Sequence, residues 1–129
     1  MKGLPIVLLV ATLLLAAGCS KEHEDLPTSF IYDPPSVPLD LQVTAGNQQA
    51  TLDWDYPVEE MDGIEEFRVY YYYEVYDLLE LIGTTNSTNF TDTQLVGNLT
   101  YCYRVSAVDT TGLEGERTET VCVFVGTSN

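Results

Sequence analysis

Hydrophobic and polar side chains alternate in short runs from residue 36 onward. Residues 39–43 alternate in this way, as do residues 50–54, and the turn-forming Ala45-Gly46-Asn47 lies between them. A period of two is typical of β-strands that bury one face, and no run shows the period of a helix. The pattern predicts a two-sheet antiparallel sandwich. Its seven strands are expected at residues 39–43, 50–54, 67–72, 78–82, 90–93, 101–108 and 121–125.

The chain begins differently, with Lys2 followed by an apolar run over residues 4–17. This run is shorter than the ~20 residues that span a bilayer and ends in small residues, which is typical of a secretory signal. Its end, Leu15-Ala16-Ala17-Gly18-Cys19, resembles the lipobox of bacterial lipoproteins. That resemblance implies a signal peptide over 1–18 and a lipid on Cys19. The family usually has Leu where Ala16 stands, so an ordinary cleavable signal is the alternative.

The lipoprotein resemblance also implies a location. Ser20 follows Cys19, whereas an Asp there is similar to an inner-membrane retention signal, so the outer membrane of the cell envelope is expected. The acidic run over 22–25 is similar to a surface-export signal, with a solvated tether as the alternative. We therefore expect residues 19–35 to form a lipidated, Pro-containing acidic tether and residues 127–129 a short tail.

Residues 36–126 resemble a fibronectin type III domain in the order of their motifs. The most specific motif is Leu95-x5-Tyr101-x-Tyr103, because a Leu and a Tyr six apart form the tyrosine corner of that family. The resemblance implies that Leu95 caps the core, that the Tyr101 hydroxyl binds backbone, and that Trp54 fills the core. The predicted fold class is therefore all-β, a seven-stranded antiparallel immunoglobulin-like sandwich of fibronectin type III type.

Two cysteines, Cys102 and Cys122, depart from this family, which usually lacks them. They lie on the last two strands, which form a hairpin, and alternation turns both outward. A hairpin centred on Gly112 would place them directly opposite each other, within disulfide reach. Because Cys19 would carry lipid, these two remain as a pair in an oxidising compartment, and we predict a disulfide. The same register sets Val105 opposite Glu119, so a bulge is expected near the loop end of the last strand.

Charge and composition exclude several functions. The 129 residues include 5 Lys and Arg against 20 Asp and Glu, a formal net charge of −15, which repels nucleic-acid phosphates. The single His, His23, falls in the tether, and no Ser, Thr or Cys has an evident base beside it. We therefore expect no catalysis, no cofactor and no nucleic-acid partner.

One candidate site is a group of carboxylates that follows the second strand. Calcium needs six to eight converging oxygens, and the spacing here is unlike an EF-hand loop. A solvated acidic face is favoured over a calcium site, and no metal is predicted. The group consists of Asp53, Asp55, Glu59, Glu60, Asp62, Glu65 and Glu66.

The other candidate is an aromatic surface on the sheet that holds the last two strands. Alternation places Tyr70, Tyr72, Arg104 and Phe124 on its open face, and Leu113 is expected at an exposed loop tip that the disulfide braces from below. Tyr and Arg clusters are typical of protein-binding surfaces and of platforms on which sugars stack. Cross-strand packing that merely shields the sheet is the alternative.

These patterns favour a non-catalytic cell-envelope lipoprotein. Its single domain would act as a binding, adhesion or spacer module on a lipid anchor, with a protein or glycan partner in the envelope. The alternative is an accessory subunit of a surface complex that captures polysaccharide or protein, with the tyrosine face touching the ligand.

Overall fold

The computed structural model describes residues 33–127. The predicted signal peptide, Cys19 and the tether up to residue 32 lie outside the described residues, as do Ser128 and Asn129. Over residues 33–127, no helix has both the length and the apolar character that crossing a membrane requires.

Seven strands form within residues 33–127, in the order that the alternation predicts. Two short 3₁₀ helices, η1 (Val58–Gly63) and η2 (Glu74–Tyr76), occupy connections in which no helix is expected from the sequence. The strands are β1 (Leu39–Gly46), β2 (Gln49–Asp55), β3 (Ile64–Tyr73), β4 (Leu78–Thr85), β5 (Asn89–Asp92), β6 (Leu99–Asp109) and β7 (Val121–Val125).

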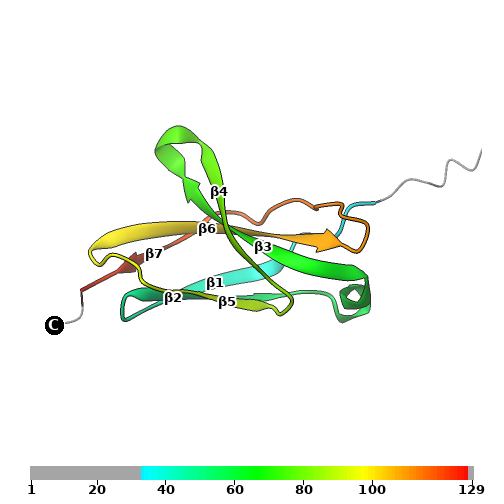
Figure 1. The fold of residues 1–129 in the computed structure, drawn as a ribbon, viewed down its shortest axis with the longest axis horizontal. Coiled ribbons are helices and arrows are strands. Elements are labelled where there is room, and N and C mark those ends of the chain that lie inside the picture. The colour runs from blue at the N-terminus through cyan, green and yellow to red at the C-terminus, as the bar shows by residue number, and fades with distance from the viewer. Residues whose placement is uncertain (1–32, 128–129) are drawn as a thin grey trace, which may run out of the picture. The chain divides into compact units, whose positions relative to one another are not determined.

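The strands build two antiparallel sheets that face each other (Figure 1). One sheet has the strand order β1–β2–β5 and the other the order β4–β3–β6–β7. This two-sheet sandwich confirms the predicted fold class. Because β3 and β6 are central, their outer faces are the broad surface on which the sequence places its candidate site.

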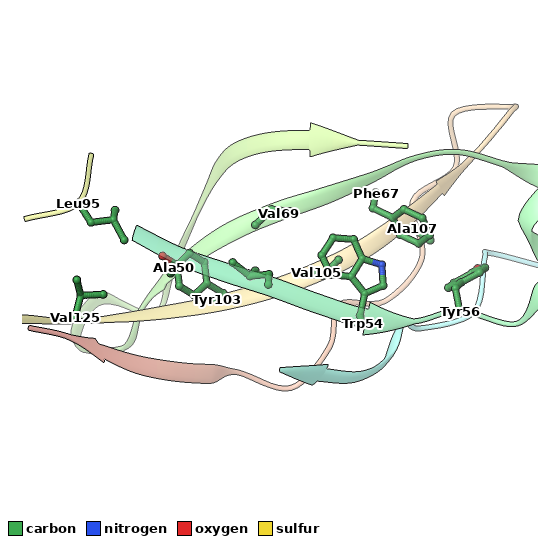
Figure 2. Packing of buried hydrophobic residues seen from close by; sticks show 11 residues of the cluster. Ala50, Trp54, Tyr56, Phe67, Val69, Leu95, Tyr103, Val105, Ala107 and Val125 are labelled. Carbon is green, nitrogen blue, oxygen red and sulfur yellow. The ribbon is translucent and has the colours of Figure 1, made fainter. Parts of the chain in front are cut away.

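The core lies between the sheets and is built from the inward members of each alternating run (Figure 2). Trp54 of β2 is 4% exposed and meets Phe67 of β3 edge-on, with ring centroids 5.4 Å apart. Val69 and Val105 beside them are fully buried. Burying an aliphatic or aromatic side chain contributes roughly 1.5–3 kcal/mol. A register slip of one residue would turn this whole set outward, so the core fixes the strand pairing.

Hydrogen bonds to Asp92 join the two sheets through the core. The carboxylate of Asp92, on β5, accepts from the hydroxyls of Tyr71 (2.5 Å) and Tyr103 (2.9 Å) on the opposite sheet. Burial raises the pKa of both tyrosines, and the bonds to the Asp92 carboxylate raise it further. Both hydroxyls therefore remain protonated donors at neutral pH.

Tyr101 fixes the connection between β5 and β6. Its hydroxyl donates to the carbonyl oxygen of Val96 and accepts from the Val96 N–H, both at 2.9 Å. Leu95, which directly precedes Val96, is 6% exposed and belongs to the core. Its N–H donates to the Gln48 carbonyl at 2.9 Å. This is the geometry of the tyrosine corner that the sequence resemblance implies.

The hairpin of β6 and β7 has the predicted register. Cys102 lies opposite Cys122, and the two form a disulfide. Nearer the loop, however, it is Thr118 that lies opposite Val105. The Thr118 N–H donates to the Val105 carbonyl (2.9 Å), and the Val105 N–H donates to the Thr118 hydroxyl (3.1 Å). The expected bulge therefore takes the form of an irregular segment before β7, which keeps Glu119 exposed.

The chain immediately before β1 packs on the domain. Pro38 is buried and Pro35 half-buried. A Cβ atom at Gly115 would overlap the Pro35 carbonyl oxygen, so this approach requires glycine.

Candidate functional site

Tyr70 is not on an open surface, and its predicted exposure is wrong. It does lie on the outer face of the larger sheet, opposite Arg104, but only 7% of it is exposed. Its hydroxyl donates to Glu114 at 2.5 Å, and the guanidinium of Arg117 lies 4.7 Å from its ring centre. The segment between β6 and β7 folds back across the sheet here, so Tyr70 is a packing residue.

Glu114 anchors that segment to the sheet. It accepts hydrogen bonds from Tyr70, Ser106 (2.6 Å) and Arg68 (3.1 Å), and Arg117 lies 3.7 Å away. Burial alone would raise its pKa, but the hydrogen bonds from Ser106 and Tyr70 and the charges of Arg117 and Arg68 outweigh burial and lower it. The carboxylate therefore holds the loop in place as an anion.

Leu113 is half-buried, so its predicted place at an exposed tip is also wrong. One carboxylate oxygen of Asp109 accepts from the N–H groups of Thr111 (2.9 Å) and Leu113 (3.0 Å), and these bonds draw Leu113 back toward the sheet. Gly112 turns the chain with a φ of 91°. The exposed tip is therefore residues 110–112.

The rest of the predicted surface lies at the other end of β6, beside the disulfide. Cys102 and Asp109 are seven positions apart on this strand, about 23 Å, so the disulfide does not brace the loop and that expectation is wrong. The guanidinium of Arg104 lies 4.2 Å from the ring centre of Tyr72, and Phe124 is 59% exposed. The structure therefore brings Tyr72 and Arg104 together as predicted and leaves Phe124 open.

A two-stranded ribbon leaves the sandwich next to these residues. Pairing of β3 with β6 ends at Tyr71, so Tyr72 and Tyr73 pair only with β4. A register shift between Val69 and Tyr70 adds twist at the base of the ribbon. The turn is made by η2 and by Asp77 in the left-handed conformation, with a φ of 48°. Figure 1 shows this hairpin rising away from the two layers.

A groove of about 390 Å³ lies against this ribbon, and we call it the tyrosine groove. Five of its ten lining residues are tyrosines, and two of these are well exposed, Tyr76 at 77% and Tyr73 at 40%. An aromatic concavity of this size is typical of a ligand site. Its lining comes from the end of β3, from η2 and from the start of β6, as Tyr71, Tyr72, Tyr73, Glu74, Val75, Tyr76, Leu99, Thr100, Tyr101 and Cys102.

Carboxylates hold two of these rings in place. The hydroxyl of Tyr72 donates to Asp77 at 2.9 Å, and that of Tyr73 donates to Glu80 at 2.7 Å. Each hydrogen bond raises the pKa of its tyrosine, because the neutral phenol is the donor. The rings are thus oriented before any ligand arrives, which lowers the entropic cost of binding.

The acidic group after β2 is divided between the two sheets and η1, with Asp53 and Asp55 exposed on β2 and Glu66 half-buried on β3, 3.1 Å from Arg68. Its central residues lie on η1, where Glu60 accepts a hydrogen bond from Ser36 at 3.0 Å. Among residues 33–127, no three His, Cys, Asp or Glu side chains converge as metal ligands. Within the described residues, the carboxylates of this group do not converge on a common point as the ligands of a metal ion would.

Comparison with known proteins gives partial sequence matches. No family model matches the chain. An amylopullulanase of Thermoanaerobacterium saccharolyticum is 34% identical over 83 residues, and an α-amylase of Niallia circulans is 36% identical over 89 residues. These matches cover 64% and 68% of this chain but only 6% of each relative. The chain therefore spans a small part of the length of these two proteins.

Solved structures give matches that cover the whole sandwich. Titin domains A168–A170 match with a TM-score of 0.63 and 21% identity, over 73% of this chain and 33% of that one. A fibronectin type III domain of the human fibronectin type III domain containing protein 3 matches with a TM-score of 0.63 and 19% identity, over 74% and 90%. The fold is that of a fibronectin type III domain. A Yersinia enterocolitica family 28 exopolygalacturonase also matches, with a TM-score of 0.61 and 17% identity, over 72% and 21%.

Within this fold, the sequence interpretation missed several exposed apolar residues that line the groove. Val75 is 88% exposed and Leu99 49%, and both line the tyrosine groove with Tyr73 and Tyr76. Alternation assigns Tyr73 to the core-facing side of β3. At Tyr73, however, β3 has already left the sandwich, so this side of the strand has no core to pack against. The available signal was the density of aromatic residues around the turn at Asp77, since side chains at a tight turn cannot all be buried.

Proposed function

We propose that this chain is a non-catalytic binding module of the cell envelope, held at the membrane by a lipid on Cys19. The tyrosine groove is the observation that carries the binding role, because it presents exposed, oriented rings on the edge of a close-packed sandwich. The anchor rests on the resemblance of residues 15–19 to a lipobox. The net charge of −15 argues against nucleic acid as a partner.

A protein of the envelope is the first candidate partner, and a glycan is the second. The glycan candidate is favoured by the relatives, since an amylopullulanase and an α-amylase are by name enzymes that act on α-glucans. The matched segment is only 6% of each of those proteins, which is consistent with a module that accompanies catalysis elsewhere. This chain would then be an accessory subunit that brings polysaccharide to the outer membrane.

Replacing Cys19 tests the anchor. We expect the full chain, produced in a two-membrane bacterium, to sediment with the outer membrane, and Cys19→Ser to appear in the soluble fraction, because loss of the acyl chains removes the membrane affinity. Labelling with a radioactive fatty acid provides the control, since only the wild-type chain should incorporate it. If Cys19→Ser sediments with membranes as the wild type does, the lipid anchor is wrong.

Competition by a soluble sugar separates the two partner classes. The full chain is immobilised, and its capture of envelope components is measured with and without maltoheptaose. Capture that the sugar abolishes favours the glycan partner. Capture of a defined protein that the sugar leaves unchanged favours the protein partner.

A further inference from the structure

The tyrosine groove has the composition of a carbohydrate site. Its lining has no Lys or Arg, and its aromatic rings stand beside the carboxylate of Glu74 and the hydroxyl of Thr100. Sugars present flat patches of C–H groups that pack on aromatic faces, and hydroxyl groups that donate to carboxylates. Aromatic faces and hydrogen-bonding groups both line this one cavity of about 390 Å³, which is within the size range of small-ligand pockets.

The exposed side chains of the groove lie at the end of the β3–β4 ribbon, where a ligand could cover them. Tyr76 is 77% exposed and Val75 88%, next to Tyr73 at 40%, all at the end of a ribbon that leaves the sandwich. An apolar cluster rimmed by polar groups is typical of an interaction site. Glu74 lines the groove, and Asp77 and Glu80 accept hydrogen bonds from Tyr72 and Tyr73, which line it; we call these three residues the rim carboxylates.

Charge selects among possible ligands. The chain carries a net charge of −15, and the carboxylates nearest the groove add a local negative potential. Arg104 is the cation nearest to Tyr72, with its guanidinium 4.2 Å from the ring centre, but it does not line the groove, and its Nε donates to Thr120 at 2.7 Å. An anionic polysaccharide would therefore be repelled, whereas an uncharged one pays no such penalty.

We propose that the tyrosine groove binds an uncharged glycan, with Tyr73 and Tyr76 stacking on sugar rings and the rim carboxylates accepting from sugar hydroxyls. This inference rests on the glycan partner named second under the proposed function. It assigns that partner a site and a ligand class. A cationic protein segment and a second copy of the chain are the competing occupants, and the experiment below distinguishes them.

Calorimetric titration of the purified full chain with maltoheptaose tests the proposal. We expect saturable binding that Tyr76→Ala and Tyr73→Ala each weaken about tenfold or more, as removal of a central aromatic contact does. Tri-galacturonic acid, the anionic probe, should not bind. Val58→Ala is the control, since Val58 is an exposed apolar residue on η1 that does not line the groove, and it should leave affinity unchanged.

The contrary outcomes are distinct. Equal affinity of Tyr76→Ala and the wild type, with unchanged melting temperatures, would overturn the groove as the site while leaving a glycan-binding module intact. Binding of tri-galacturonic acid as tight as that of maltoheptaose would overturn the uncharged ligand class. The glycan would be wrong as the ligand if no sugar bound and the chain instead bound a Lys-rich peptide or dimerised, with Tyr76→Ala abolishing that interaction. The proposed envelope module fails separately, through the Cys19→Ser fractionation.

Discussion

At the residue scale, Glu114 determines where the segment between β6 and β7 lies. Its carboxylate accepts from three side chains on the two central strands and is the point at which the segment meets the sheet. Tyr70 and Ser106 are buried beneath it, so neither hydroxyl has water as a substitute acceptor. A buried donor without its acceptor costs about 1–3 kcal/mol.

We therefore expect Glu114→Ala to lower the free energy of unfolding by about 2–3 kcal/mol, through the two hydroxyls that it leaves unpaired. Glu114→Gln should lose less, because it keeps an acceptor oxygen. The measurement is urea denaturation, and Glu116→Gln, an exposed change in the same segment, is the control. Equal stability of Glu114→Ala and the control would show that the network contributes nothing.

The lowered pKa of Glu114 gives this contribution a pH dependence. Because the folded pKa lies below the ordinary value of 4.5, the contribution is complete above pH 4.5 and is lost as the pH falls through the folded pKa. The stability difference between the wild type and Glu114→Gln should therefore shrink on acidification below pH 4.5. A difference that is constant down to pH 3 would contradict the assignment.

At the element scale, the disulfide joins β6 and β7 at the end of the sandwich that carries the tyrosine groove. Cys102 lines the groove, and Cys122 is opposite it on the edge strand. The link closes a loop of 20 residues, which includes the irregular segment around Thr118. In the chain-entropy model such a loop contributes about 3 kcal/mol.

Removing the link with Cys102→Ala and Cys122→Ala should accordingly lower the free energy of unfolding by about 3 kcal/mol while the fold persists. The neighbouring pair, Thr100→Ala with Phe124→Ala, is the matched control, because it faces across the same strands without a covalent bond. Thiol alkylation followed by mass spectrometry checks the premise. Two thiols that react in freshly isolated, unreduced protein would contradict it.

At the scale of the whole molecule, the sequence is sufficient to predict the sandwich and the register of its last hairpin. Trp54, Val69 and Val105 each belong to a run in which apolar residues recur with period two, and a slip of one residue would turn that run outward. The opposed positions of Cys102 and Cys122 follow from the same rule.

Alternation is not sufficient to predict which parts of the outer surface are open. It places Tyr70 on the outer face correctly, but burial there depends on a distant segment that folds back through Glu114. It also treats β3 as uniform, although the strand leaves the sheet after Tyr71 and so exposes Tyr73. Both outcomes depend on tertiary contacts of loops, which no local periodicity records.

The central proposal is that this sandwich, with the fibronectin type III fold, binds a glycan through the tyrosine groove. The most direct test is a two-dimensional amide NMR titration of the ¹⁵N-labelled full chain with maltoheptaose. We predict saturable shifts confined to residues 72–77 and 99–102, with the amides of β1, β2 and β5 unmoved. Shifts centred on the β1–β2–β5 sheet, or on residues 110–112, with the hairpin amides unmoved, would contradict the claim.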